Sequence, residues 1–448
     1  MTTVQPTITV PAHVPFPQTL ERRDTARLRA YAENLDFYNG LQWSGRPRRQ
    51  ERRLVFNYVK TLVDKVAAYV CADVRADVTP LDASPGARDG ARAAEDALRR
   101  IAEDNDLDLL DLDSEVDAAI LGDGCYKVTW DSEGRRVRIT TPDVQGIYAW
   151  WTGDDISRVW RVASRYRLAQ EEAEDAFGMD LAAHGAGDRP VTVVEVWTAR
   201  DFQLWVDSAL VQEMPNPYGF LPFIIYPNLR LPKQFWGVSD VGPLIEPARE
   251  LNRTLSQLST ILELSGNPIA VLENVDGAQD IAVQPGAVWE LPERARAYLL
   301  DLLQGGGVRL HADYTEVVYR ALHDISEVPR TAFGQNSQAL SGVALEMEMQ
   351  PLLQKVKRKR LIRGAVYRKR NEMALRILEQ KTGVSYAPYR THVLWGPVLP
   401  QDRSRDIQDE ELLVRSGVHS RRTAMLRLGV QDPDTELARI AEEQTAGG

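Results

Sequence analysis

The sequence is poor in cysteine and has no long apolar stretch. Only two of its 448 residues are cysteine, Cys71 and Cys125, and neither has a partner at the spacing of a metal-binding motif. With so few thiols a disulfide framework is not expected, and both cysteines are interpreted as core residues. No apolar run reaches the roughly 18 residues that a membrane span requires, so no membrane partner is expected.

The motifs of common catalytic sites are missing as well. The chain contains no G-x-x-x-x-G-K-[ST] phosphate loop, no G-x-S-x-G and no H-E-x-x-H. Its six histidines are scattered. His311 and His323 share one expected helix, but they lie over three turns apart, too far to hold one metal. We therefore expect no catalytic residues, no metal and no cofactor.

Basic residues are fewer than acidic residues. Lys and Arg number 54 against 64 Asp and Glu, which gives a formal net charge of −10. A protein that wraps DNA for affinity is normally basic, because neutralising phosphates drives that binding. An acidic chain can still let DNA pass without holding it. With 44% hydrophobic and 26% charged residues, the composition indicates a soluble chain of about three domains with a sizeable core.

The first half of the chain predicts a flexible arm and one mixed domain. Residues 1–18 contain four prolines and no basic segment of the kind that opens a signal peptide. The first 230 residues combine apolar residues at helical spacing with alternating segments, which predicts one mixed α+β domain. Helices are expected at 19–40, 57–71, 91–103, 112–122 and 168–177. Strands are expected at 74–80, 125–130, 136–140, 145–151, 157–167, 191–198 and 202–206.

The middle of the chain predicts two long helices with a small head between them. In residues 237–266 apolar residues alternate spacings of three and four, which is typical of a coiled-coil-like seam. The seam leucines are Leu244, Leu251, Leu255 and Leu258. Residues 269–305 predict short strands and a small helix at 293–303, and a second long helix follows at 309–328. A monomeric enzyme rarely needs such an arrangement, whereas a ring of subunits around a hole does.

An uncharged polar loop, residues 334–341, follows the second helix. Its centre carries Gln335, Asn336, Ser337 and Gln338. Amides of this kind touch a phosphate backbone weakly, without trapping it, and an ordinary surface loop is the alternative. A long helix then begins near residue 342, and Pro351 is expected to kink or restart it. A strand is expected at 391–395, followed by short helices at 407–415, 421–428 and 434–443.

A basic run occupies the long helix. Nine of the sixteen residues from 355 to 370 are Lys or Arg, with no acid among them. Positive charge on so many faces must meet water, acids or phosphate. The candidates for DNA contact are Lys355, Lys359 and Arg363, because the run follows the polar loop; a solvated or acid-paired face is the alternative.

An acidic cluster precedes the first predicted hairpin. Its members are Glu103, Asp104, Asp106, Asp108, Asp111, Asp113, Glu115 and Asp117. Convergent carboxylates could hold two metals in a nuclease. The leucines interleaved with them favour an amphipathic helix with a solvated acidic face instead. Metal-dependent cleavage of DNA that is lost in Asp111→Ala would support the nuclease.

Several segments, in order, resemble the portal proteins of long-tailed double-stranded DNA phages. They are Asn57-Tyr58-Val59-Lys60, Gly122-Asp123-Gly124-Cys125-Tyr126, Trp236-Gly237-Val238-Ser239-Asp240, Ser341-Gly342-Val343-Ala344-Leu345 and Gly417-Val418-His419-Ser420. The resemblance covers most of residues 20–443. It implies an α+β portal fold with a mixed α/β wing, a two-helix stem, a small β-containing clip, a long kinked helix after a tunnel loop, and a reduced helical crown.

The resemblance also implies domain boundaries. They are 1–18 for the arm, 19–236 for the wing, 237–266 and 308–333 for the two stem helices, 267–307 for the clip, 334–341 for the tunnel loop, 342–405 for the long helix and a strand returning to the wing, and 406–448 for the crown and tail. On this reading Gln335, Asn336, Ser337 and Gln338 line a DNA tunnel, and the seam leucines pack between subunits.

The implied function is a passive, gated DNA conduit at one capsid vertex of the virion. The implied partners are further copies in a ring, typically of twelve, together with double-stranded DNA, the terminase large subunit, a head-completion adaptor, and major capsid and scaffolding proteins. Assembly in the host cytoplasm is expected. The alternatives are a metal-dependent nuclease and a non-viral oligomeric scaffold.

Overall fold

The computed structural model describes most of the chain in two units. The described residues are 16–20, 22–47, 51–178, 189–266, 269–274, 294–300, 307–334, 342–398, 403–430 and 432–446. The units are Met1–Leu394 and Trp395–Gly448, and each is described by itself. Helices and strands both contribute, which confirms the α+β class.

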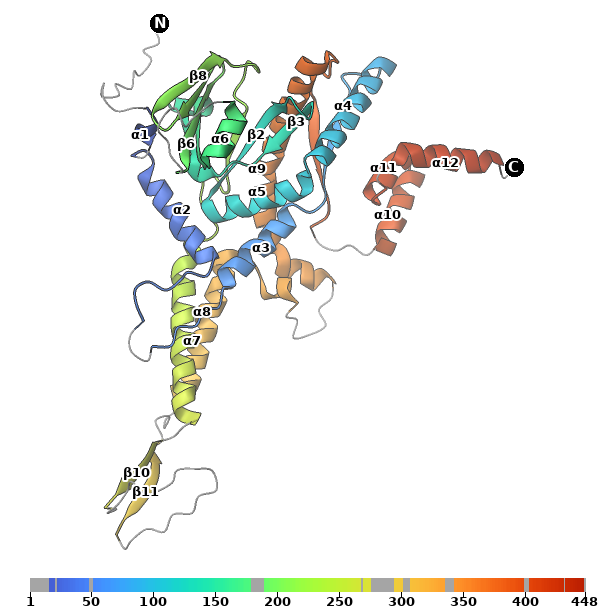
Figure 1. The fold of residues 1–448 in the computed structure, drawn as a ribbon. Helices are drawn as coiled ribbons and strands as arrows, with labels where there is room; N and C mark the ends of the chain where they lie inside the picture. Colours follow the sequence, from blue (N-terminus) through green and yellow to red (C-terminus); the bar gives the residue numbers. More distant parts are fainter. Residues whose placement is uncertain are drawn as a thin grey trace. The chain divides into compact units, whose positions relative to one another are not determined.

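The first unit opens with helices, most of which pack against the last of them, α5 (Figure 1). They are α1 Phe16–Leu20, α2 Thr25–Tyr38, α3 Tyr58–Val70, α4 Pro85–Asp104 and α5 Leu107–Leu121. The side chain of Asn57 accepts a hydrogen bond from the backbone N–H of Lys60 and so caps α3. Ser84 caps α4 in the same way, and Pro85 takes the first helical position. The predicted helices are confirmed in outline. The helix expected at 19–40 divides into α1 and α2, α4 begins six residues earlier than expected, and α5 begins five residues earlier.

Two antiparallel sheets lie beside these helices. A three-stranded sheet has the order β3-β2-β9, and a five-stranded sheet has the order β4-β5-β6-β7-β8. Their strands are β2 Asp123–Asp131, β3 Arg136–Thr140, β4 Ile147–Thr152, β5 Asp155–Leu168, β6 Val191–Thr198, β7 Asp201–Val206, β8 Ala209–Pro215 and β9 Phe223–Pro227. The predicted hairpin is confirmed, with Lys127 opposite Thr140 and Asp131 opposite Arg136. Strands β8 and β9 were not predicted. The helix α6, Gln170–Phe177, follows β5 as expected.

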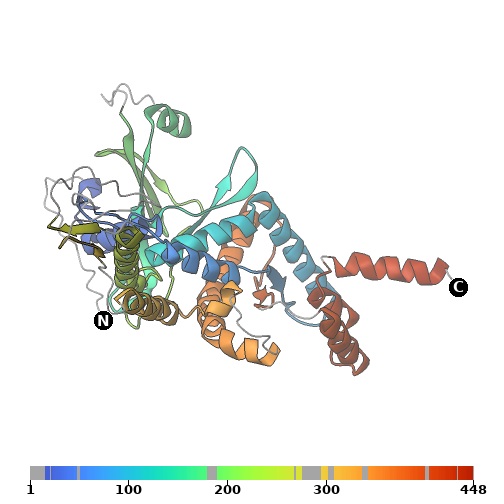
Figure 2. The same ribbon diagram turned by 90° about the horizontal axis from the view of Figure 1, so that it is seen from below.

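Two long helices, α7 Ile245–Gly266 and α8 Gly307–Ser326, pack side by side (Figures 1 and 2). The first begins later than predicted, because the backbone from Gly237 to Val241 bonds to α5 and to Leu229 instead of forming a helix. A short 3-10 turn, η3 Gly242–Leu244, leads into α7.

A small antiparallel pair lies between the two long helices in the sequence. Strands β10 Ile269–Glu273 and β11 Arg296–Leu300 pair with Ile269 opposite Leu300. The helix predicted at 293–303 is therefore wrong over 296–300. A segment this short adopts the conformation for which it finds a pairing partner, whatever its local propensity.

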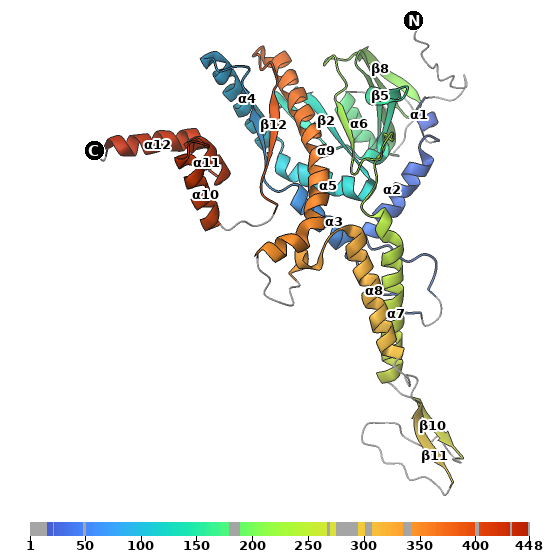
Figure 3. The same ribbon diagram turned by 180° about the vertical axis from the view of Figure 1, so that it is seen from behind.

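The longest helix is α9, Gly342–Thr382. Pro351 lies inside it, and the helix continues through that position without restarting. Figure 3 shows the first part of α9 turned away from the axis of the rest, as expected for a helix with an internal proline. The chain then returns as β12 Thr391–Trp395, which pairs with β1 Val74–Val78.

The described residues of the second unit form the helices α10 Arg403–Arg415, α11 Arg421–Arg427 and α12 Pro433–Ala446. Ser420 caps α11 by accepting from the backbone N–H of Thr423. Glu410 is buried between His419 and Arg427 and joins α10 to α11. None of the helices in the described ranges is long and apolar enough to cross a membrane.

The leucine seam of α7 divides into two halves. Leu244 and Leu251 are each only 2% exposed within the single chain, whereas Leu255 and Leu258 are half-buried. The first two therefore belong to the core of the protomer, and the expectation that they pack between subunits is wrong. Leu255 and Leu258 remain partly exposed and could still contact another subunit, so their packing between subunits stays a prediction.

Leu251 should consequently stabilise the folded protomer. Replacing a buried leucine by alanine removes packing and leaves a cavity, so Leu251→Ala should lower the free energy of unfolding by about 2–5 kcal/mol. Urea unfolding followed by circular dichroism measures this change. Gln257→Ala, on an exposed position of the same helix, should change it by less than about 0.5 kcal/mol. Equal unfolding curves for the two variants would contradict the assignment of Leu251 to the core.

Candidate functional site: the junction of the long helices

The chain enters α7 through a tightly held segment that begins at Gly237. The backbone N–H of Gly237 donates to the Asp123 carboxylate at 2.7 Å. A side chain at Gly237 would clash with the carbonyl oxygen of Gly122, so only glycine fits this approach. Asp123 also accepts a 2.5 Å hydrogen bond from the hydroxyl of Tyr31. These contacts fix where the first long helix leaves the α+β domain.

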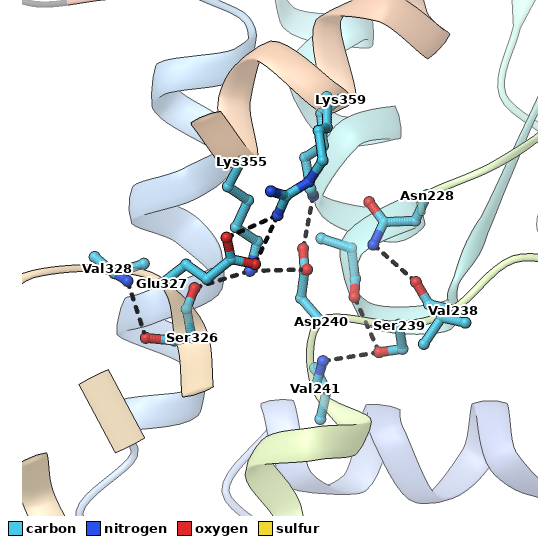
Figure 4. Close-up of polar contacts among 12 residues, drawn as sticks. Asn228, Val238, Ser239, Asp240, Val241, Ser326, Glu327, Val328, Lys355 and Lys359 are labelled. Atoms are coloured by element: carbon cyan, nitrogen blue, oxygen red, sulfur yellow. Dashed lines mark hydrogen bonds and ion pairs between the residues drawn. The ribbon is translucent and has the colours of Figure 1, made fainter. Parts of the chain in front are cut away.

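Ser239 and Asn228 also hold the segment before α7 against the α+β domain (Figure 4). The Ser239 hydroxyl donates to the carbonyl oxygens of Ala119 and Ile120 at the end of α5, and accepts from the N–H of Val241 at 2.9 Å. The Asn228 side chain donates to the carbonyl oxygen of Val238 at 3.0 Å. The buried side chains of Ser239 and Asn228 thus have hydrogen-bond partners, as burial requires.

Asp240 is the charged centre of the junction. Its carboxylate meets the amine of Lys355 at 3.0 Å and the amine of Lys359 at 2.6 Å, and all three side chains are buried (Figure 4). Burial by itself raises the pKa of Asp240, but the two lysine charges more than offset that effect and hold the pKa well below its usual range. The carboxylate is therefore ionised and paired.

Lys355 also contacts the end of the second long helix. Its amine donates to the carbonyl oxygen of Ser326, the last residue of α8, at 3.0 Å. A cation at a helix C-terminus is favourable because the last carbonyl groups carry partial negative charge. Glu327, just beyond, pairs with Arg358 at 2.7 Å. Lys355 of α9 thus joins the start of α7 to the end of α8.

The same face of α9 continues into α5. Glu115 accepts from Lys359 at 3.0 Å and from Arg363 at 2.6 Å. Arg363 also donates to the carbonyl and side-chain oxygens of Asn228. One step further, Arg370 pairs with Asp111, which accepts a 2.8 Å hydrogen bond from the Tyr126 hydroxyl. We call Asp111, Glu115, Asp240, Lys355, Lys359, Arg363 and Arg370 the junction cluster.

Three basic residues that were predicted to contact DNA belong to the junction cluster instead. Lys355 is 4% exposed, Lys359 0% and Arg363 1%. A side chain that is buried and paired with an internal carboxylate cannot reach a phosphate. The acid-paired alternative therefore holds for these three residues. The other long side chains of the run include Lys357, Arg368 and Lys369, which are exposed.

The acidic cluster likewise separates into two groups. Asp111 and Glu115 are buried in the junction cluster, while Asp108 and Asp113 face solvent. In the described ranges no group of His, Cys, Asp or Glu is arranged to hold a metal. The carboxylates that could have converged in a nuclease instead pair with α9. Asp111→Ala would accordingly disturb the fold, so it would not be a clean test of catalysis.

Sequence reasoning missed the partners of the basic run. Lys355, Lys359 and Arg363 recur every four residues, and so do Asp111 and Glu115, which places each set on one helix face. That spacing was the available signal for helix-to-helix pairing. Asp240 gave no such signal, because its role follows from the fold around Gly237.

The tunnel-loop residues Gln335, Asn336, Ser337 and Gln338 lie outside the described residues. Both sides of that segment are described. The turn η5 Arg330–Phe333 ends at Gly334, which has a φ of +78°, and α9 starts at Gly342. Lys355 is therefore little more than three turns into the helix that follows the loop.

Removing one buried amine should destabilise the junction strongly. Lys359→Met keeps the length of the side chain but leaves Asp240 and Glu115 each short of a partner. Breaking a buried ion pair in this way should lower the free energy of unfolding by about 3–5 kcal/mol, measured by urea unfolding. Lys357→Met, which is exposed on the same helix, is the control and should have almost no effect. Equal stability of the two variants would contradict a structural role for the cluster.

Acid unfolding should report the pairing of Asp240. A carboxyl whose pKa is lower in the folded state stabilises the fold above its unfolded pKa of about 3.8, and this stabilisation is lost as the pH falls toward the folded value. Lys355→Met removes one of the two lowering charges and so raises the folded pKa. The variant should unfold at a higher pH than the wild type in a circular dichroism titration. An unchanged midpoint would mean that Lys355 does not hold Asp240 ionised.

The sequence also matches a known protein family. A family model described as phage portal protein, SPP1 Gp6-like, matches residues 18–447. A comparison with curated proteins finds no match. The family match spans both long helices, the segment between them, the junction cluster and the C-terminal helices. The chain therefore belongs to the SPP1 Gp6-like family of phage portal proteins.

Proposed function

We propose that twelve copies of the chain form a closed ring at one capsid vertex, with α7 and α8 packed around a central tunnel. Membership of the family makes the chain a portal protein of the virion, a head–tail connector through which DNA is packaged. We propose the number of copies, the contacts within the ring and the individual partners.

The observation that carries the proposal is an apolar stripe on α8. Leu310 is 72% exposed, Tyr314 47% and Val317 61%, and their spacing of four and three places them on one helix face. Leu262 of α7 is also largely exposed. The adjoining face of α8, with Val318 and Leu322, is buried. We call Leu310, Tyr314 and Val317 the α8 stripe.

A second copy is the natural cover for the α8 stripe. Contiguous exposed apolar side chains mark interaction surfaces, since leaving them in water is unfavourable. A head-to-tail contact that closes into a ring covers the same stripe on every copy and leaves no free edge. Leu255 and Leu258, half-buried on α7, are proposed to contribute to the facing surface.

We propose the following domain assignment for a chain that assembles in this way. Residues 19–236 are proposed as the wing, 237–266 and 308–333 as the stem, 267–307 as the clip and 406–448 as a small crown and tail. The clip is proposed to dock the terminase large subunit and later a head-completion adaptor. The outer surface is proposed to contact the major capsid and scaffolding proteins, with assembly in the host cytoplasm.

The proposed mechanism requires no bond chemistry. Gln335, Asn336, Ser337 and Gln338 are proposed to line the narrowest part of the tunnel, where uncharged amides touch double-stranded DNA without retaining it. The junction cluster begins at Lys355, more than three turns into the helix that follows this loop, and connects that helix to the start of α7 and the end of α8. A displacement of the loop along the tunnel would therefore be resisted by buried ion pairs.

Disrupting the α8 stripe should prevent ring formation. Leu310→Asp combined with Val317→Asp places two charges in the proposed contact. Burying each apolar side chain is worth about 1.5–3 kcal/mol, so ring formation should need a concentration at least about tenfold higher. Negative-stain electron microscopy and native mass spectrometry measure the rings and their copy number.

The matched control for this experiment is Ala312→Asp, which places a charge at an exposed position of α8 on the side away from the stripe. It should assemble like the wild type. Normal rings from the double variant would show that the stripe is not an interface. A wild-type protein that stays monomeric at high concentration would contradict the proposed self-assembly.

A further inference from the structure

The exposed side of α9 forms the floor of a broad groove. Two depressions of about 580 and 780 Å³ lie on either side of the helix, one against β12 and the other against β5 and β9. Both are lined by Ala365 and Lys369, so they adjoin across α9. We call this surface the α9 groove; the residues used below are Arg158, Trp160, Leu361, Arg368, Lys369 and Arg390.

The α9 groove is basic, and its charge is not neutralised within the protomer. Arg158, Arg368, Lys369 and Arg390 line it, and within the described residues none of them forms an ion pair with an acid. The single acid of the lining, Glu372, pairs with Arg376 at 2.7 Å instead. Removal from water lowers the pKa of Lys369, with only a partial offset from Glu372. An added carboxylate would thus find several free cations.

The groove also has an apolar component. Leu361 is 71% exposed at its floor, and Trp160 of β5 is exposed at its wall. A surface that combines free positive charge with exposed apolar side chains fits a ligand with acids around an apolar residue. A bare phosphate backbone would use the charges and leave the apolar part uncovered.

The corner between α4 and α5 offers that chemistry in the same chain. The exposed acids there are Glu103, Asp104, Asp106, Asp108 and Asp113. In the described part of the chain none of them forms an ion pair. Leu109, among them, is 60% exposed. We call these five acids and Leu109 the acidic corner.

The acidic corner is held in a defined shape. The Asn105 side chain donates to the carbonyl oxygens of Ile101 at 2.8 Å and Val137 at 3.0 Å, and accepts from the N–H of Ile139 at 2.8 Å. These bonds fix the turn between the two helices against β3. A partner would therefore meet a preorganised surface, which lowers the entropy lost on binding.

The corner and the groove lie on opposite sides of α9. The face of α9 with Lys359 and Arg363 contacts α5. Of the groove residues, Leu361 and Arg368 project from the opposite side of the helix and Lys369 from its flank. In Figure 1 α5 lies in front of α9, and in Figure 3 α9 lies in front. One protomer cannot fill its own groove with its own corner, but the next copy in a ring can.

We propose that the acidic corner of one copy docks into the α9 groove of the next copy. The contact joins Asp108 and Asp113 to Lys369, Arg368 and Arg390 around the exposed Leu109. It rests on the proposed ring, and it adds a second, electrostatic contact outside the stem. Because the two surfaces differ, the contact is head-to-tail and repeats around the ring.

Charge reversal on each side tests the contact. The groove variant carries Lys369→Glu and Arg390→Glu, and the corner variant carries Asp108→Lys and Asp113→Lys. Each alone juxtaposes like charges, so the concentration at which rings form should rise at least about tenfold. In an equimolar mixture every altered groove can meet an altered corner. The mixture should regain rings that contain both variants in equal numbers, visible by native mass spectrometry.

The control variant reverses two exposed charges elsewhere on α4, Arg88→Glu and Arg92→Glu, and should form rings like the wild type. Thermal unfolding of every variant checks that the fold is retained. Leu109→Ala, which changes no charge, should weaken ring formation less than charge reversal does.

Three outcomes would overturn the docking. If both charge-reversed variants form rings at the wild-type concentration and with the wild-type salt dependence, the docking is wrong while the proposed ring stands. If the groove variant forms normal rings but loses affinity for a fluorescent DNA duplex, the groove binds phosphate rather than a second copy. If the wild-type protein forms no rings, both the docking and the proposed ring fail.

Discussion

The pairing of buried charge on α9 is the constraint on which the rest of the structure depends. Four cations on one face of this helix lie in the interior, and each must meet a carboxylate or carbonyl oxygen, because an unpaired buried charge is very unfavourable. Their partners come from α5, from Asp240 before α7, and from the end of α8. Helix α5, the start of α7, the end of α8 and α9 are consequently positioned by one set of interactions.

The pair of helices α7 and α8 has two different ends. One end is packed into the core of the protomer, and the rest exposes apolar side chains. The first turns of α7 and the last turns of α8 are buried near the junction, with Leu244, Leu251 and Leu322 in the core. Farther along the helix pair the apolar side chains become exposed, as at Leu262 and Leu310. A helix pair that is anchored at one end and apolar along its length presents the same surface on every copy. Such a surface favours closed, symmetric assembly over irregular aggregation.

Much of the fold could be predicted from local signals, and the candidate site could not. The hairpin of β2 and β3, the cap at Asn57 and the length of α9 follow from turn residues, capping residues and apolar spacing. The strand at Arg296–Leu300 depends on its pairing with β10, which no local pattern reveals. The burial of Lys359 depends on Glu115 and Asp240, which lie far away in the sequence. A basic run looks the same from sequence whether its partner is an internal acid or a phosphate.

The two faces of α9 show how one basic run can serve two purposes. On the inner face, cations are matched by acids and enclosed, so they stabilise the junction but are inaccessible to any ligand. On the outer face, Arg368 and Lys369 have no ion pair within the described residues, so their charge remains available. The acids of the chain divide in the same way, with Asp111 and Glu115 enclosed and Asp108 and Asp113 exposed. Arg368 and Lys369 line the groove on α9, whereas Asp108 and Asp113 lie on α5, so the proposed docking pairs these exposed charges between copies.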